Sequence, residues 1–193
     1  VGEAVQRLLA WSERELERVE QQLTPTWDGL LRPLEEMDRP WEYVWGSVRH
    51  LLGVQNSDDL RKAHEEMLRN VVSFGLKVQQ SSTIYSGLKA LRDGPGWAEL
   101  DEAQRRVVDL KLLAAVHAGV GLKGEQRERF NEITQAASEI STEFSNHVLD
   151  ATKAFALVVV NRKDTEGWPD SLLRLASQSY NQSVGEGGDA GTP

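Results

Sequence analysis

The feature that most constrains the fold is an apolar stripe that keeps helical spacing over roughly 35 residues, from about residue 124 to about residue 160. Its members lie mostly three, four or seven positions apart: Phe130, Ile133, Ala137, Ile140, Phe144, Ala151, Phe155 and Val158. That spacing places them on one face of an α-helix about 50 Å long. A stripe of this length needs several partner helices to cover it, so it predicts a long spine helix in a multi-helix array.

Helical periodicity also dominates the rest of the chain, and no stretch shows the apolar and polar alternation of a strand. Capping residues and breakers mark the other helices. A first helix ends before Thr24-Pro25, a third follows the cap Ser57-Asp58, a fourth covers Ile84 to Leu91, a fifth follows Asp101, and a short last one runs from Trp168-Pro169-Asp170 to Tyr180. We therefore predict an all-α fold, an antiparallel array of about six or seven helices.

The second helical region, between Trp27 and Leu52, contains Pro33 and Pro40. Proline lacks a backbone donor, and its ring crowds the preceding helical turn. We therefore expect a kinked or broken helix in this region.

Composition limits the domain organisation and the classes of partner. A chain of 193 residues with 39% hydrophobic content can form one buried core, so we predict one helical domain, 1–183, followed by a flexible glycine-rich tail, 184–193. The net charge of −8, with basic residues scattered among acids, argues against nucleic acid as a partner. The longest apolar run, 154–160, is far shorter than the roughly 20 residues of a transmembrane helix.

The stretch AHEEML, residues 63–68, looks like the zinc-peptidase motif H-E-x-x-H with Leu68 in place of the second histidine. Zinc needs a second ligand one turn after His64, and leucine supplies no lone pair. The chain has no cysteine, and it contains no nucleophile elbow or phosphate-binding loop. We therefore interpret His64 as an ordinary residue at a helix boundary beside solvated acids, and we expect no catalytic residue and no metal ligand in this chain.

Three motifs in the segment 121–155 point to a known family. They are G-L-x-G-E-x-R-E-R-F-N-E-I, E-I-S-T-E-F-S-N and V-L-D-A-T-K-A-F, and further matches follow the same order at 25–27 (PTW), 85–91 (YSGLKAL) and 167–169 (GWP). The chain resembles, to about Tyr180, the N-terminal helical region of the thimet oligopeptidase and oligopeptidase A family of zinc endopeptidases. It is most similar to the plant and algal organellar members.

The resemblance implies a non-catalytic role for this region. Family members continue for several hundred residues and carry their H-E-x-x-H helix in that later part, so zinc is expected only in a catalytic domain that this chain lacks. By the same resemblance the region would form one wall of a deep channel that admits short peptides. The implied location is the chloroplast stroma or the mitochondrial matrix, with the cytosol as the alternative.

Two functions follow from the resemblance. The chain is either a non-catalytic interaction module, such as an accessory subunit of an organellar assembly, or a fragment of an organellar zinc oligopeptidase that forms the wall of its peptide channel. Either function needs a protein partner or the missing catalytic domain, and short peptides are a further candidate ligand.

Aromatic residues at helix starts and breaks are the candidate partner surface. A helical module separated from a larger enzyme should keep an apolar face, and exposed patches of that kind usually mark an interface. At helical spacing Trp41 and Trp45 are more often core residues than a binding platform. The predicted interface residues are Trp41, Tyr43, Trp45, Trp168, Leu172 and Tyr180.

Overall fold

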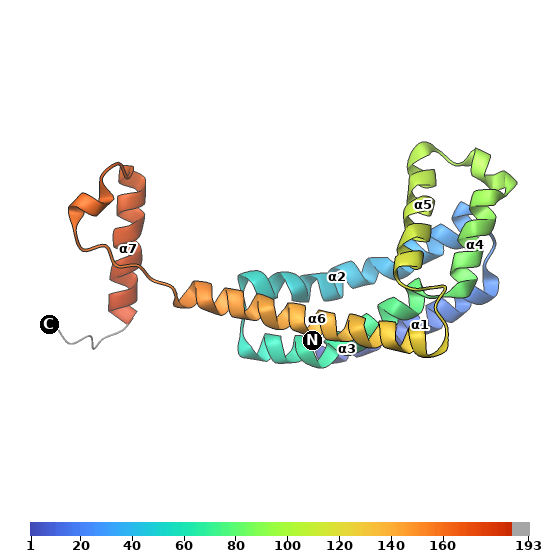
Figure 1. Cartoon of the computed structure of the whole chain (residues 1–193), viewed down its shortest axis with the longest axis horizontal. Helices are drawn as coiled ribbons and strands as arrows, with labels where there is room; N and C mark the ends of the chain where they lie inside the picture. The colour runs from blue at the N-terminus through green and yellow to red at the C-terminus, as the bar shows by residue number, and fades with distance from the viewer. Residues whose placement is uncertain (187–193) are drawn as a thin grey trace. The chain divides into compact units, whose positions relative to one another are not determined.

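The computed structural model describes the backbone of residues 1–186 and the side chains of residues 1–183. Within these residues it has seven α-helices: α1 (Gly2–Gln22), α2 (Arg32–Val54), α3 (Asp58–Gln79), α4 (Ser82–Asp93), α5 (Glu102–His117), α6 (Gly124–Ala154) and α7 (Asp170–Glu186) (Figure 1). Shorter turns are the π-helical η1 (Trp27–Leu31) and the 3-10 helices η2 (Pro95–Glu99) and η3 (Arg162–Thr165). The described residues contain no strand, which confirms the all-α prediction.

The chain divides into two compact units, Val1–Asn146 and His147–Pro193, whose boundary falls inside α6. The first unit holds α1 to α5 and most of α6, and the second holds the end of α6, η3 and α7. The last helix continues to Glu186, beyond the predicted end at Tyr180. The tail predicted for 184–193 therefore supplies the last three residues of α7, and its remainder lies outside the described residues.

Capping side chains fix the starts of three helices. Ser57 Oγ accepts a hydrogen bond from Leu60 N at 3.2 Å, and Ser81 Oγ accepts one from Ile84 N at 3.1 Å. Asp101 and Gln104 form a capping box, in which each side chain accepts a hydrogen bond from the other residue's backbone N–H, at 2.7 and 3.0 Å. These bonds satisfy N–H groups that have no partner within the helix, which is why the chain starts a helix at these points.

The second helical region is interrupted at its start and continuous through Pro40. The π-helical turn Trp27–Leu31 precedes α2, and Pro33 occupies the first turn of α2, where a backbone N–H has no helical partner. Pro40 lies inside α2 without ending it, so the break that the sequence predicts occurs before α2 and not at Pro40. Met37 before the proline and Trp45 after it are both buried, and their packing holds the helix together across the lost hydrogen bond.

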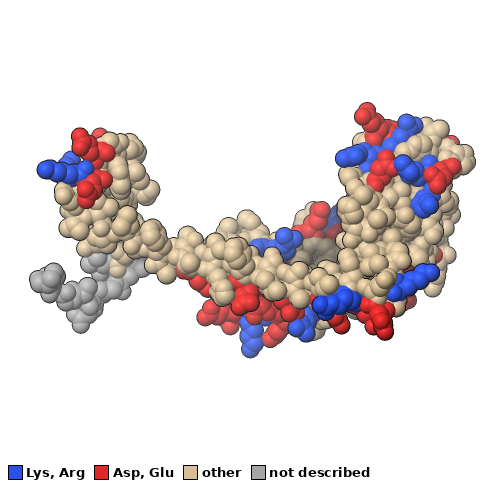
Figure 2. All heavy atoms as spheres, viewed as in Figure 1, with Lys and Arg blue, Asp and Glu red and all other residues tan. Residues whose placement is uncertain are grey.

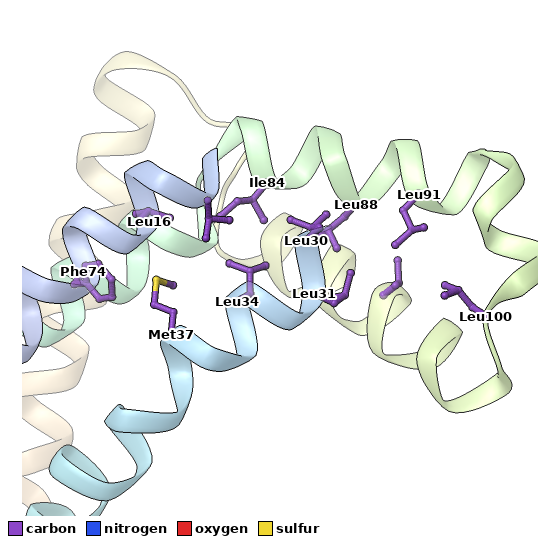
Figure 3. Packing of buried hydrophobic residues seen from close by; sticks show 12 residues of the cluster. Leu16, Leu30, Leu31, Leu34, Met37, Phe74, Ile84, Leu88, Leu91 and Leu100 are labelled. Carbon is purple, nitrogen blue, oxygen red and sulfur yellow. The ribbon is translucent and has the colours of Figure 1, made fainter. Parts of the chain in front are cut away.

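The main core of the first unit lies where α1, η1 and α2 meet α4 and α5. Its most deeply buried side chains include Leu16, Leu30, Leu31, Met37, Leu88, Leu91 and Val108. Figure 3 shows Leu30 and Leu88 pointing toward one another. A Cβ on Gly87 would lie 2.7 Å from a methyl carbon of Leu23, so the absence of a side chain there lets α4 pack closely against the end of α1.

A second, smaller core cluster joins α1, α2 and α3. Its buried members are Val5, Trp45, Val48, Met67 and Leu68. Leu68, which replaces the second histidine of the zinc motif, is therefore a core residue of α3.

The longest helix, α6, begins at Gly124 as the stripe predicts and ends at Ala154, six residues before the predicted end. The valines of 158–160 follow, and β-branched residues favour helices less than straight-chain ones do. No residue of α6 is buried, and Ile133, Ile140 and Phe144 are 53%, 65% and 68% exposed. The apolar stripe is therefore present, but the described residues do not cover it as the sequence predicts.

The core predicts a large effect of shortening Leu31, which is fully buried. Leu31→Ala removes apolar contacts and leaves a cavity, so we expect the free energy of unfolding to fall by about 2–5 kcal/mol. Urea unfolding followed by circular dichroism measures the change. Leu113→Ala is the matched control, because Leu113 on α5 is 50% exposed, and we expect a loss of less than about 1 kcal/mol. Equal losses for the two variants would contradict this description of the core.

Candidate functional site

A cleft of about 330 Å³ opens in the first unit between α2, α3, α4 and α5. Most of its wall is apolar, and the residues that define it are Leu34, Trp41, Trp45, Phe74, Ile84 and Leu88. Four of these lining residues, Leu34, Phe74, Ile84 and Leu88, also belong to the main core and are labelled in Figure 3. We call this site the aromatic cleft. Its volume falls within the range of about 300–1,000 Å³ that is typical of small-molecule sites.

Two tryptophans of α2 are held in the cleft wall by neighbouring helices. Trp41 Nε1 donates a hydrogen bond to Ser12 Oγ on α1 at 3.0 Å, and the Trp41 ring stacks on Phe74 of α3 with ring centroids 5.8 Å apart. Trp45 stacks on His64 of α3, with centroids 4.7 Å apart and an angle of 13° between the rings. The aromatic surface is therefore fixed before any ligand binds.

His64 lies in the core behind Trp45 and is only 5% exposed. The sequence placed it on the third helix at the boundary of the apolar stripe, beside solvated acids, whereas the structure buries it within α3 on the side that packs against α2. Burial lowers its pKa below the ordinary value; Glu65 opposes this shift and Arg49 adds to it. Within the described residues His64 Nδ1 has no hydrogen-bond partner. A neutral imidazole that stacks on Trp45 is the form that this environment favours.

The mouth of the cleft carries one basic and one acidic side chain. Lys111 Nζ on α5 lies 4.0 Å from Asp38 Oδ2 on α2. Burial raises the pKa of Asp38 above its usual range, Lys111 partly offsets this, and Glu42 and Glu35 raise it further. The two charged lining residues are thus one carboxylate and one ammonium group, and Glu35 and Glu42 lie near Asp38 on α2 outside the lining.

The six predicted interface residues lie in different environments. Trp45 is only 9% exposed and Trp41 is partly buried, so in this chain both line the aromatic cleft instead of an outer patch. Tyr43 on α2 is 73% exposed. Trp168, Leu172 and Tyr180 belong to the second unit, where Leu172 and Tyr180 are exposed and Trp168 is partly exposed. The interface role of these residues stays a prediction.

The α6 stripe is an exposed apolar surface that sequence reasoning did not assign to an interface. The sequence signal for this surface was the stripe itself. We interpreted the stripe as part of the core, because the apolar face of a helix usually packs against the core. The stretch after α6 is also exposed, including Phe155 and Val160. Large apolar side chains that share one exposed helix face usually mark a contact surface.

Charge and metal-binding features are sparse in the described part of the chain. No cluster of three or more His, Asp or Glu side chains is placed there to hold a metal ion. On the face drawn in Figure 2, basic and acidic side chains are interspersed, with no continuous basic area. Among the described helices, none has both the length and the apolar content to cross a membrane.

Comparison with known proteins defines the family. The model of the neurolysin/thimet oligopeptidase N-terminal domain matches residues 5–127. The chain therefore belongs to this family, which confirms the resemblance seen in the sequence.

Individual relatives extend the match over most of the chain. It is 40% identical over 179 residues to organellar oligopeptidase A, chloroplastic/mitochondrial, of Arabidopsis thaliana, covering 93% of this chain and 23% of the relative. It is 39% identical to a probable cytosolic oligopeptidase A of the same plant, covering 93% of this chain and 26% of the relative. Oligopeptidase A of Escherichia coli is 36% identical, over 90% of this chain and 26% of the relative. The chain thus spans about a quarter of the length of these curated relatives.

Burial of His64 predicts a pH-dependent stability. Its pKa is lowered in the folded protein, so the unfolded chain takes up the proton first as the pH falls. The contribution of neutral His64 is complete above its ordinary value of 6.5 and declines as the pH falls from there toward the lowered folded pKa. We expect His64→Phe, which keeps an aromatic ring against Trp45, to flatten the dependence of Tm on pH between about pH 7.5 and 5.5.

Thermal unfolding of the two proteins across this range measures the effect. His50→Gln is the control, because His50 is exposed on α2, and it should retain the slope of the parent protein. An unchanged slope in His64→Phe would mean that burial of His64 does not control the pH response.

Proposed function

We propose that this chain is the non-catalytic helical part of an oligopeptidase A-like peptidase and acts by binding a catalytic domain through the exposed face of α6. The observation that carries this proposal is the exposure of Ile133, Ile140 and Phe144 on one face of the longest helix. The chain matches about a quarter of each relative's length. The remaining three quarters of such a protein are therefore the candidate partner for this face.

The spacing of the stripe suits a helical partner. From Phe130 to Phe144 the apolar positions alternate between intervals of three and four residues, the pattern that packs one helix along another. Burial of such a face contributes roughly 25 cal/mol for each Å² of apolar surface removed from water. Covering several large side chains therefore favours association strongly enough to offset part of its entropic cost.

In this proposal the catalytic domain supplies zinc and the cleavage chemistry, and the helical part helps to form the wall of a channel for short peptides. The support is the relatives' name, oligopeptidase A, together with the resemblance to a family whose zinc helix lies in a later part of the chain. We further propose an organellar location, in the chloroplast stroma or the mitochondrial matrix. The cytosol is the alternative, since the relatives include both kinds.

A stand-alone accessory subunit of an organellar assembly is the second candidate. It is favoured by the exposed Leu172 and Tyr180 on α7, which give the second unit an apolar surface of its own. In that case the partner would be a different protein, and peptide cleavage would play no part.

A chimera tests the first candidate. This chain replaces the aligned N-terminal region of the Arabidopsis organellar oligopeptidase A, and cleavage of a quenched fluorescent peptide and Tm are measured. We expect the chimera to be active and this chain alone to cleave no peptide. Ile140→Lys in the chimera should lower Tm and activity, because burying an unpaired ammonium in an apolar contact is costly.

Ser145→Lys is the matched control for charge. Ser145 is also exposed on α6, about 140° around the helix from Ile140, and its hydroxyl bonds only to a backbone carbonyl of its own helix. If Ile140→Lys and Ser145→Lys behave alike, α6 does not bind the catalytic domain through its stripe, and the accessory role becomes the better candidate.

A further inference from the structure

The aromatic cleft is a preformed space that the peptidase family assignment does not explain. It lies within the first unit, and no apolar side chain of the described residues fills its volume of about 330 Å³. Four aromatic residues line it: Trp41, Trp45, Phe74 and Tyr85. Because two of them are anchored by a hydrogen bond or a ring stack to other helices, the wall cannot easily collapse to close the space.

Gly75 is a second observation that points to a ligand. It lies within α3, where glycine destabilises a helix by roughly 0.5–1 kcal/mol relative to alanine. A Cβ at this position would meet no atom within 4 Å, so close packing does not require glycine here. Gly75 lines the cleft, and the consequence of its missing side chain is that the cleft stays open.

The charges at the mouth select the ligand. Asp38 lines the cleft, and Glu35 and Glu42 lie near enough on the same helix to raise its pKa. Lys111 is the one cation among the lining residues. Glu35 and Glu42 stand three residues before and four residues after Asp38, which places all three carboxylates on one side of α2. Their negative charge favours a ligand that ends in a positive group at Asp38 over one that ends in a carboxylate.

The geometry points to the aromatic cleft as a binding site for a small hydrophobic amine, whose apolar body occupies the cleft between α2 and α3 and whose ammonium group lies at Asp38. The body would replace water against Trp41, Trp45 and Phe74. The electron-rich faces of aromatic rings near the mouth also attract an ammonium group. The residues that line this site belong to α2, α3, α4 and α5 and not to α6. The test of this inference therefore does not depend on the proposed function.

Three probes with the same apolar body and different end groups test the site on the whole chain. 4-Phenylbutylamine, 4-phenylbutanol and 5-phenylpentanoate carry the same phenylbutyl body and end in a cation, a neutral hydroxyl and an anion. Isothermal titration calorimetry at low salt measures each affinity. We expect the amine to bind about tenfold more tightly than the carboxylate, with the alcohol between them. Equal affinities, or a preference for the carboxylate, would overturn the proposal.

Gly75→Leu tests the location of the site. Its side chain would occupy the open space beyond Gly75, so we expect it to abolish binding of all three probes while the helix content and the Tm of the protein are maintained. Gly75→Ala is the control, since it adds one methyl group and should largely preserve binding. Undiminished binding to a folded Gly75→Leu protein would place the probes elsewhere and refute the assignment.

Asp38→Asn tests the charge without touching the core, because Asp38 lies at the mouth. We expect the amine to lose about threefold in affinity, as is usual for a partly exposed charge, and the alcohol to be unaffected. Glu36→Gln removes one negative charge from the exposed face of α2 and should change neither affinity. Equal effects of Asp38→Asn and Glu36→Gln would show that Asp38 does not hold the ammonium group.

Discussion

Burial of Leu30 and Leu31 is the contact on which the rest of the first unit depends. Both side chains are completely buried at the junction between η1 and α2, against residues of α4 and α5. They fix the start of α2, and the cluster around Trp45 and Val48 fixes its later turns against α1 and α3. The aromatic cleft lies beside the stretch of α2 between these two anchors, where Trp41 packs against both clusters.

Polar contacts hold the start of α6, none of whose residues is fully buried. Gln80, only 2% exposed, donates through Nε2 to Ala118 O at 2.8 Å and to Asn131 Oδ1 at 2.7 Å, and its Oε1 accepts from Arg127 Nε at 2.8 Å. These bonds join the end of α3 to the end of α5 and the first turns of α6. Because polar groups hold the helix against α3 and α5, most of its apolar residues do not have to face these helices, and Ile133, Ile140 and Phe144 remain exposed for another contact.

The helix pattern and the caps could be predicted from the sequence, because they depend on neighbours within a few positions. Ser57 and Asp101 cap helices as their side chains predict, and α6 begins at Gly124. The environment of His64 could not be predicted, since it depends on Trp45, which the chain brings close only by packing α2 on α3. The exposure of the α6 stripe could not be predicted either. Periodicity shows that a helix has an apolar face, but it does not show what covers that face.

The role of His64 links the misleading zinc motif to the cleft. His64 stacks directly behind Trp45, and Trp45 lines the cleft, so a neutral imidazole supports the aromatic wall. A zinc ligand at this position would need its ring nitrogens directed at a metal, whereas here the flat face of the ring is used and Nδ1 is buried. His64 therefore serves packing and not metal binding. One turn later, where a zinc peptidase has its second histidine, Leu68 completes an apolar cluster.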